Sequence, residues 1–229
     1  MILLTDIGNT CVKVSLSNGR EVTDVRRYSY DEVPWAQLLD ACEEVRLSLV
    51  GPSPSQLFAL ARERGKKILR VRDVQALHND EEWAQVDAPQ ALGEDRLAAV
   101  LGARRRTQGC DVLVIDCGTC LTTDLVSREG EHLGGIISPG LRLRLESMHE
   151  HTAALPSVSP DGEAPIWALT TEGAMRGGAF NGLRYEMEGY IRAARERLPR
   201  VQVFYTGGIP LTLSEEVTLC PNLVLEGLL

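Results

Sequence analysis

The first part of the chain alternates between short apolar runs and amphipathic stretches. Three strands are expected in the first thirty residues, because apolar residues fill most of 1–7 and alternate strictly with polar ones over 11–17, and a third run follows near 20–28. Asn18-Gly19 is typical of a two-residue hairpin turn in which both residues have positive φ. Beyond them, the pattern favours helices over 35–46, 54–64 and 93–106, and strands over 47–50 and 67–71.

The same order of elements starts again near residue 111. An apolar strand over 111–116 ends on Asp116, much as the first run ends near Asp6, and both are followed by further strands and then helices. Later strands are expected over 121–126, 132–137 and 201–205, and helices from Pro139 and over 170–198. This order predicts an internal duplication. We expect two similar α/β halves, 1–109 and 110–229, with a ligand-binding cleft between them.

The composition is that of an ordinary soluble globular protein, with 44% apolar and 24% charged residues among 229. The net charge of −8 argues against a nucleic-acid partner, which would favour a basic surface. No apolar run approaches the roughly 18 residues of a membrane span, and the first residues lack a secretory-signal pattern. We therefore expect a cytoplasmic protein without a membrane partner.

Six cysteines are scattered along the chain, and in the cytoplasm they are expected to be reduced. Cys117 and Cys120 have the spacing of a zinc or redox pair. A zinc site needs a second pair of ligands at matching spacing, and the sequence offers none. The sequence therefore does not favour a metal at these thiols.

The residues that end the two Asp-containing strands suit phosphate binding. After the first strand, Asp6 is suited to hold Mg²⁺ through water, Gly8 allows close backbone approach, and Asn9 and Thr10 supply donors. Lys13 in the next strand can meet a phosphate as a point charge. The second loop repeats the pattern with Asp116, Gly118, Thr119 and Thr122. One such loop is more often a plain turn, but two at matching places favour a pair of phosphate loops.

The segment Gly93-Glu94-Asp95-Arg96 begins a predicted helix and has two interpretations. Asp95 can simply complement the helix N-terminus, with Arg96 as a surface charge. Alternatively, the carboxylate orients a substrate hydroxyl while the guanidinium holds an anionic group. On these residues alone the first interpretation is favoured.

The loops together resemble the superfamily of acetate and sugar kinases, Hsp70 and actin, and in detail the type III pantothenate kinases. The first loop of that family, D-x-G-N-T-x-x-K, is similar to DIGNTCVK over 6–13, and its L-G-x-D-R segment to LGEDR over 92–96. The second loop, D-x-G-T-A-x-T, is similar to DCGTCLT over 116–122, with Cys120 in place of Ala. Further similar stretches lie over 134–140, 152–156 and 171–178, so the resemblance spans nearly the whole chain in order.

The resemblance implies a duplicated actin-like, ribonuclease H-like α/β fold and ATP-dependent phosphorylation of pantothenate in coenzyme A biosynthesis. It implies that Asp95 is the general base, Asp116 binds K⁺ or NH₄⁺, and Mg²⁺ accompanies ATP. The ATP-binding residues it implies are Asp6, Ile7, Gly8, Asn9, Thr10, Cys11, Val12, Lys13 and Thr119. The pantothenate-binding residues it implies are Gly93, Glu94, Asp95, Arg96 and Thr171. A homodimer is expected, and Thr171 would serve the partner's cleft if the sites are shared.

One residue departs from the family pattern. The family usually has a Tyr nine residues before the Asp of L-G-x-D-R, and this chain has Val86 there. The pocket is then reshaped, or another aromatic such as Trp83 fills the place. Two alternatives stay open: a kinase for another small hydroxyl compound, and an ATP-binding, actin-like regulator without transfer.

Overall fold

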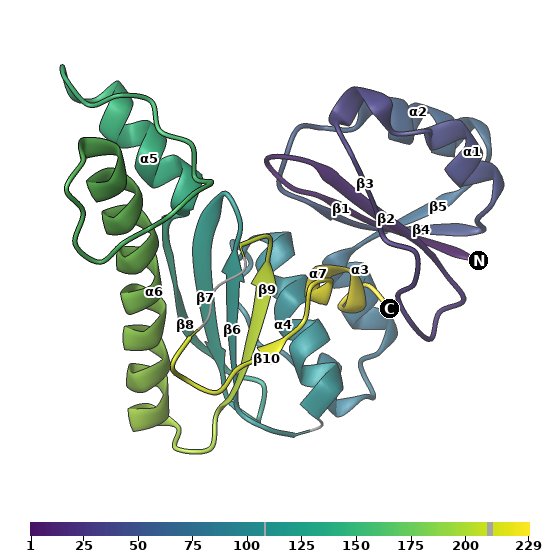
Figure 1. The fold of residues 1–229 in the computed structure, drawn as a ribbon. Coiled ribbons are helices and arrows are strands. Elements are labelled where there is room, and N and C mark those ends of the chain that lie inside the picture. Colours follow the sequence, from purple (N-terminus) through teal and green to yellow (C-terminus); the bar gives the residue numbers. More distant parts are fainter. Residues whose placement is uncertain (108, 210–212) are drawn as a thin grey trace.

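Two mixed five-stranded sheets organise the chain in the computed structural model, which describes residues 1–107, 109–209 and 213–229. The first sheet has the order β3-β2-β1-β4-β5 and the second the order β8-β7-β6-β9-β10 (Figure 1). The strands of the first sheet are β1 (Ile2–Ile7), β2 (Val12–Ser17), β3 (Arg26–Tyr28), β4 (Glu44–Leu49) and β5 (Lys67–Arg70). Those of the second are β6 (Val112–Cys117), β7 (Cys120–Val126), β8 (His132–Pro139), β9 (Gln202–Gly207) and β10 (Thr218–Leu219).

The two sheets repeat one topology. In the first, β1, β2 and β3 form an antiparallel meander while β4 and β5 add in parallel on the other side of β1. In the second, β6, β7 and β8 form the same meander and β9 and β10 add in parallel in the same way. The expected duplication of an α/β unit is therefore confirmed at the level of strand order and direction.

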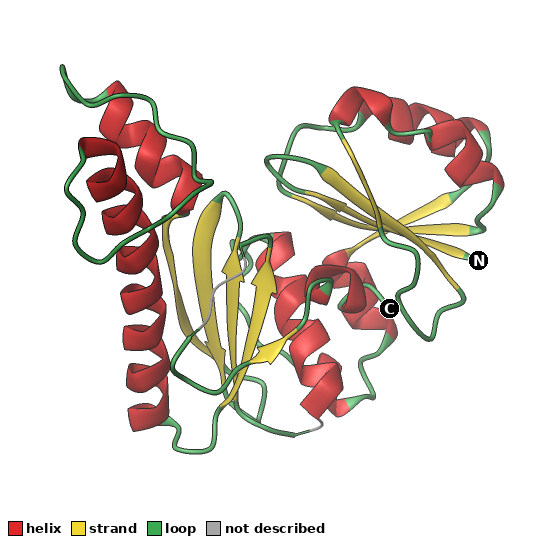
Figure 2. Ribbon diagram, viewed as in Figure 1, coloured by secondary structure: helices red, strands yellow, loops and turns green. Residues whose placement is uncertain are grey.

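Helices form three layers around the sheets (Figures 1 and 2). The outer face of the first sheet is covered by α1 (Trp35–Asp40) and α2 (Ser55–Glu63), and that of the second by α5 (Leu141–Glu150) and α6 (Thr171–Arg197). Between the sheets lie α3 (Val71–Leu77), α4 (Glu94–Thr107) and α7 (Leu223–Glu226). Short 3-10 turns span Tyr30–Glu32 and Glu82–Ala84. Among the described helices, none combines the length and apolarity needed to cross a membrane.

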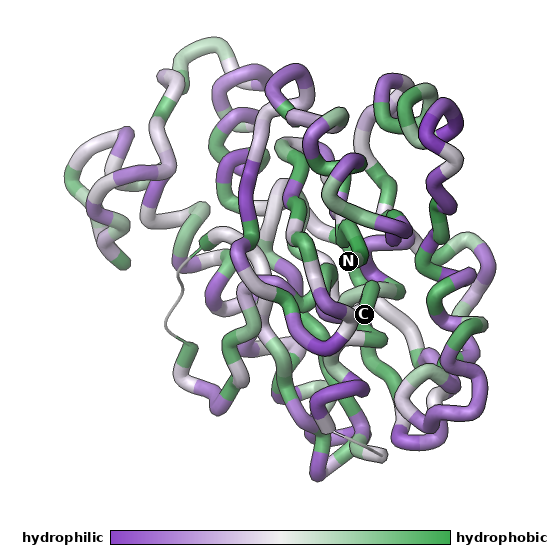
Figure 3. Tube along the Cα trace, turned by 90° about the vertical axis from the view of Figure 1, so that its right-hand side faces the viewer, coloured by the Kyte–Doolittle hydropathy of each residue, from purple (hydrophilic) through white to green (hydrophobic). Residues whose placement is uncertain are grey.

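The strands form this core because both of their faces are covered. In β1, Leu3 and Ile7 belong to the cluster under α1 and α2, whereas Leu4 belongs to the cluster between the sheets. Successive side chains of a strand point to opposite faces, so one apolar run contributes to two cores. Figure 3 shows the same arrangement, with apolar segments inside and hydrophilic ones at the periphery. The middle layer takes residues from both halves, and the boundary expected near residue 109 stays a prediction.

The expected hairpin turn at Asn18-Gly19 is wrong. Gly19 has a φ of 86°, but Asn18 is not among the described residues with positive φ, and β3 starts only at Arg26. The hydroxyl groups explain the longer connection, because Ser17 Oγ donates to the Glu21 carbonyl oxygen at 2.6 Å and Ser15 Oγ bonds a carbonyl further along. These local bonds compete with the ladder of a tight hairpin.

Two helix boundaries also differ from the expected ones. The helix expected over 35–46 ends at Asp40, because β4 begins at Glu44 and pairs in parallel with β1. Pro139 ends β8 instead of starting a helix, and α5 begins at Leu141. The short helix α3 was not expected; its first turn is capped by Asp73, whose carboxylate accepts from the Arg70 backbone N–H at 2.8 Å.

Candidate active site

A cleft of about 740 Å³ lies between the two halves, at the turns that follow β1 and β6. Its lining contains many of the residues that the sequence indicated. Those that line it are Asp6, Gly8, Asn9, Thr10, Cys11, Lys13, Asp95, Asp116, Gly118, Thr119 and Thr122. Ile7 and Val12 do not line it, because their side chains are buried in the outer core of the first half. The cleft therefore collects polar groups from both repeats at one place.

The first loop connects β1 to β2 and is held by groups from elsewhere in the same half. Asp6 pairs in register with Lys13, and the Gly8 N–H donates to the Cys11 carbonyl at 3.2 Å. Tyr30 closes the loop from outside, donating its hydroxyl to the Gly8 carbonyl at 2.6 Å. Gly51 packs so closely that a Cβ there would lie 1.9 Å from the Gly8 oxygen. The backbone of the loop is thus fixed on two sides.

The second loop is the counterpart in the other repeat. Asp116 pairs in register with Thr122, and the Gly118 N–H donates to the Cys120 carbonyl at 2.9 Å. Gly140 donates its N–H to the Thr119 carbonyl at 3.0 Å and lies against the loop backbone. The hydroxyl of Thr119 also contacts that of Thr10 in the first loop. The two loops therefore touch across the cleft.

Among the carboxyl groups that line the cleft, Asp6, Asp95 and Asp116 lie close enough for their charges to interact. Burial raises the pKa of Asp116 to about 6; Lys13 opposes this rise, while the charges of Asp6 and Asp95 add to it. Burial also raises the pKa of Asp6, where Lys13 again opposes it and Asp95 adds to it. Lys13 brings a positive charge to this group, with its Nζ 3.8 Å from Asp6 Oδ2. The cleft floor is therefore a negatively charged place that favours a cation.

Asp95 has the environment of a base. Burial raises its pKa, and the backbone N–H of Arg96, which donates to Asp95 Oδ1 at 2.8 Å, opposes the rise. A carboxylate with a raised pKa accepts a proton more readily at neutral pH than an exposed one. The chemistry that this group supports is the removal of a proton from a bound hydroxyl.

The donor set fits a hard cation. Carboxylate oxygens are the ligands that Mg²⁺ and similar ions prefer. In the described parts of the chain, no three His, Cys, Asp or Glu side chains converge closely enough to enclose an ion by themselves. An ion here would therefore take part of its coordination from phosphate oxygens or water, which is how Mg²⁺ is commonly held beside nucleotides. Asp6 and Asp116 supply carboxylate oxygens to this part of the cleft.

The residues at the start of α4 differ in whether they reach the cleft. Asp95 faces the cleft, but Gly93, Glu94 and Arg96 are not among the residues that line it. Glu94 Oε2 accepts from the Leu49 N–H at 3.0 Å and from the Arg70 guanidinium at 2.9 Å. Arg96 instead forms an ion pair in the second half. Within this cleft, only Asp95 of the four is in reach of a ligand.

Thr171 lies apart from the cleft. It is exposed at the first position of α6, next to Thr170, whose hydroxyl accepts from the Gly173 N–H at 3.1 Å and caps the helix. Within one copy of the chain, the structure therefore does not bring Thr171 together with Asp95 and the two loops.

Several lining residues were not indicated by the sequence reasoning. They include the cationic Arg27 of β3 and Arg142 of α5, and the anionic Glu146 of α5. Arg27 pairs in register with Lys13, so it could have been found from strand pairing once Lys13 was placed in the site. Residues of α5 gave no such signal, because only the tertiary fold brings that helix to the cleft.

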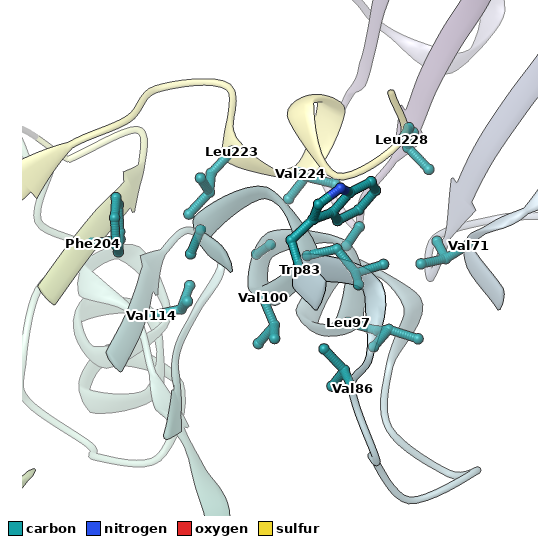
Figure 4. Close-up of a cluster of buried hydrophobic side chains, with 14 of the residues drawn as sticks. Val71, Trp83, Val86, Leu97, Val100, Val114, Phe204, Leu223, Val224 and Leu228 are labelled. Carbon is teal, nitrogen blue, oxygen red and sulfur yellow. The ribbon is translucent and has the colours of Figure 1, made fainter. Parts of the chain in front are cut away.

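The position where the family usually has Tyr belongs to the core. Val86 and Trp83 are both buried in the cluster between the sheets, beside α4 and α7 (Figure 4). The Trp83 indole N–H donates to Glu81 at 2.6 Å, and Arg105 stacks over its ring. Trp83 is not among the residues that line the cleft, so it does not replace the family's Tyr there.

Two like α/β halves that present paired Asp-x-Gly turns to one cleft define a duplicated, actin-like α/β fold. Solved structures of that fold are similar over nearly the whole chain. A Baf family protein of Campylobacter jejuni matches with a TM-score of 0.62 at 21% identity, covering 98% of this chain and 94% of the other. A ROK family glucokinase from Streptomyces griseus matches with a TM-score of 0.52 at 11% identity, covering 99% and 97%.

The family follows from sequence comparison. Residues 2–193 match the model of the type III pantothenate kinase family. Relatives with that name include one from Phocaeicola vulgatus, 33% identical over 208 residues that cover 91% of this chain and 86% of the relative. One from Bacteroides fragilis is 36% identical with the same coverage, and one from Christiangramia forsetii is 30% identical over 100% and 96%. The chain belongs to the type III pantothenate kinase family.

Proposed function

We propose that the protein transfers the γ-phosphoryl group of ATP to the hydroxyl of pantothenate and forms 4'-phosphopantothenate, at the start of coenzyme A biosynthesis. The observation that carries the proposal is the convergence of Asp95 with the two phosphate loops in one cleft. Family membership supports the choice of substrate.

The loops have the groups that hold ATP. The backbone N–H groups near Gly8 and Gly118 and the hydroxyls of Thr10 and Thr119 are donors for phosphate oxygens. Lys13 supplies one positive charge beside them. Phosphoryl transfer passes through a loose transition state, so positioning and charge neutralisation contribute most of the catalysis. Mg²⁺, as in other ATP-dependent kinases, supplies further positive charge when it is bound.

Asp95 acts as the general base in this proposal. Its carboxylate lines the same cleft as the loops and takes the proton of the attacking hydroxyl late in the transfer. Gly93, Glu94 and Arg96 then support the segment at the start of α4 that carries Asp95. Val86, in the core between the sheets, shapes this segment from its buried side.

Asp116 is the residue we assign to a monovalent cation, K⁺ or NH₄⁺. The support is its position on the cleft floor, where burial and neighbouring carboxylates disfavour an uncompensated charge. Asp6 is assigned to Mg²⁺ through water, since its carboxylate shares the same part of the cleft.

The assembly in this proposal is a homodimer. Thr171 is exposed and lies apart from the cleft of its own chain, as expected if it serves a second copy. The residues before it carry exposed apolar side chains, Ile166, Trp167 and Leu169, which suit a protein interface. A cytoplasmic location is also part of the proposal, and the six free cysteines agree with a reducing compartment.

A second candidate is a kinase for another small hydroxyl compound. The observation that favours it is Val86, because the family usually has a phenol at that place and this chain has an aliphatic core residue. An ATP-binding regulator without transfer is disfavoured, since such a protein needs no carboxylate of raised pKa facing the nucleotide cleft.

The test is ADP release by purified protein with ATP and Mg²⁺, with and without pantothenate, in K⁺ or in Na⁺ at matched ionic strength. We expect release that needs pantothenate and is faster in K⁺, with the phosphorylated product identified by mass spectrometry. Pantothenate lacking its primary hydroxyl is the matched control. ADP release that does not depend on pantothenate would favour the second candidate. Equal rates in K⁺ and Na⁺ would contradict the assignment of a monovalent cation to Asp116.

A further inference from the structure

The guanidinium of Arg96 is held by the second half of the protein. Its Nε donates to Asp124 Oδ2 at 2.8 Å and its Nη2 to Asp124 Oδ1 at 2.7 Å, which is a two-bond ion pair between α4 and β7. The Asp124 side chain is 3% exposed and that of Arg96 15% exposed. Paired charges with this geometry are stronger and more directional than single contacts.

A histidine is the second hydrogen-bond partner of the Asp124 carboxylate. His132 Nε2 lies 2.6 Å from Asp124 Oδ1, and the imidazole is 6% exposed. Gly135 leaves room for the group, because a Cβ there would lie 2.2 Å from Arg96 Nη2 and 2.6 Å from Asp124 Oδ1. Both oxygens of Asp124 therefore have donors, and the network leaves no space for a side chain at residue 135.

The turn between β7 and β8 also holds the chain that leads to Asp95. The His132 N–H donates to the Asp87 carbonyl at 3.1 Å, and the Asp87 N–H donates to Gly130 at 2.8 Å. At the far end of α4, the buried Arg104 donates to Ser127 at 2.8 Å and to the carbonyl of Trp83. The segment before α4 is thus attached to the β7–β8 hairpin at Asp87, and the far end of α4 is attached to it through Arg104.

We propose that Asp124 and His132 are positioning residues for the phosphoryl transfer, which act through Arg96 on the neighbouring Asp95. The inference rests on the proposed function. Asp95 and Arg96 are consecutive in the first turn of α4, and the Arg96 N–H donates to Asp95 Oδ1 at 2.8 Å. Holding the guanidinium on β7 therefore fixes the rotation of that turn and the direction of the Asp95 carboxylate. Small displacements of such a group cost large factors in rate.

The test compares Asp124→Asn with Asp111→Asn. Asp111 is a matched control, because it is a buried aspartate that pairs with Arg128 of the same hairpin and touches neither Arg96 nor the cleft. We expect Asp124→Asn to lower kcat/KM for pantothenate by about tenfold or more while KM for ATP changes less than about twofold. Asp111→Asn is expected to leave both constants near those of the wild type.

A double-mutant cycle separates positioning from simple folding effects. In the Arg96→Lys background, Asp124→Asn should add little, because the route through Arg96 is already weakened. Additive losses, an equal rise in KM for ATP, or the same loss in Asp111→Asn would overturn the inference. If Asp124→Asn does not fold, His132→Phe removes one donor and keeps the ion pair; it should lower kcat/KM for pantothenate less but with the same selectivity.

Amide hydrogen exchange tests the positioning role of Asp124 independently of the proposed function. The peptide over 92–98 should exchange faster in Asp124→Asn than in Asp111→Asn, whatever the substrate is. Unchanged exchange would overturn the positioning role. A wild-type protein that ignores pantothenate would overturn the proposed function, and the exchange data would still decide whether Asp124 holds the segment.

Discussion

The hydroxyls of Thr10 and Thr119 lie 2.7 Å apart, although the two residues belong to different repeats and are 109 positions apart in the chain. Each threonine follows an Asp-x-Gly turn, so the contact joins the two phosphate loops at the cleft. One hydroxyl donates to the other in this arrangement. Both residues line the cleft, and in the proposed function their hydroxyls are donors for phosphate oxygens.

The first prediction concerns this pair. Thr119→Val keeps the shape of the side chain and removes its donor, so we expect KM for ATP to rise by about tenfold, since a hydrogen bond to a charged group contributes roughly 1.5–3 kcal/mol. Steady-state kinetics with ATP varied at saturating pantothenate measures it. Thr218→Val, at an exposed position of β10, is the control and should leave KM unchanged. An unchanged KM for ATP in Thr119→Val would remove this residue from the ATP site.

The sequence allowed the repeated order of strands and the two loops to be predicted, because local patterns determine both. Apolar periodicity predicts strands, and Asp-x-Gly between two strands is a compact signal. The roles of the residues near Asp95 needed the tertiary fold. The partner of Arg96 is Asp124, 28 residues away on another strand, and no spacing rule connects them.

The errors have the same origin in competition between local and distant interactions. Helical spacing continued past Asp40, but the edge of β1 offered a parallel strand partner to Glu44–Leu49, and pairing outweighed propensity. Similarly, Asn18-Gly19 suits a tight turn, but the hydroxyls of Ser15 and Ser17 stabilise a longer connection. These outcomes depend on contacts that a pattern of residue types does not contain.

The second prediction separates Glu94 from the substrate. Glu94→Gln weakens the pair with Arg70, so we expect a loss of at most about 1–2 kcal/mol in the free energy of unfolding, reduced by the partial exposure of the pair. The kcat/KM for pantothenate should change less than about threefold, since Glu94 does not line the cleft. Urea unfolding and kinetics measure the two. A large rise in KM for pantothenate at unchanged stability would instead show that Glu94 contacts the substrate.

The third prediction concerns the pH dependence of stability through Asp116. Its pKa is about 6 in the folded protein and 3.8 in an unperturbed chain, so the folded state binds the proton more tightly. This contribution to stability is fully present below pH 4, and it is lost as the pH rises through 6, where the buried carboxyl ionises. Asp116→Asn removes this pH-dependent loss of stability, because asparagine does not ionise. We therefore expect the variant to unfold like the wild type at pH 4 and to be more stable at pH 8.

The size of that gain is bounded. A shift of about two pKa units corresponds to at most about 3 kcal/mol. Thermal unfolding of nucleotide-free protein from pH 4 to 8 measures the difference between variant and wild type. A difference that is constant across this range, or largest at pH 4, would contradict the assigned pKa. Activity of the variant in K⁺ should be strongly reduced in the same preparations.

The last prediction concerns the backbone that supports the second loop. Gly140 has an ordinary φ of −72°, so a side chain there is not strained by its own backbone, but a Cβ would lie 2.4 Å from the Gly118 oxygen and 2.6 Å from that of Thr119. Both are backbone atoms that a rotamer change cannot move. Gly140→Ala must therefore displace the loop, and we expect about 1–3 kcal/mol of destabilisation together with a more than tenfold loss of kcat/KM for ATP.

Gly178 provides the matched substitution, because it lies inside α6 and nothing is within 4 Å of the position of its Cβ. Gly178→Ala should stabilise the protein by about 0.5–1 kcal/mol, since alanine loses less backbone entropy than glycine when the helix forms. The kcat/KM for ATP should stay unchanged. Urea unfolding and ATP kinetics on the two variants give the comparison. If Gly140→Ala loses stability but keeps its affinity for ATP, the second loop does not position the nucleotide. The proposed contact of Thr119 with ATP would then also be wrong.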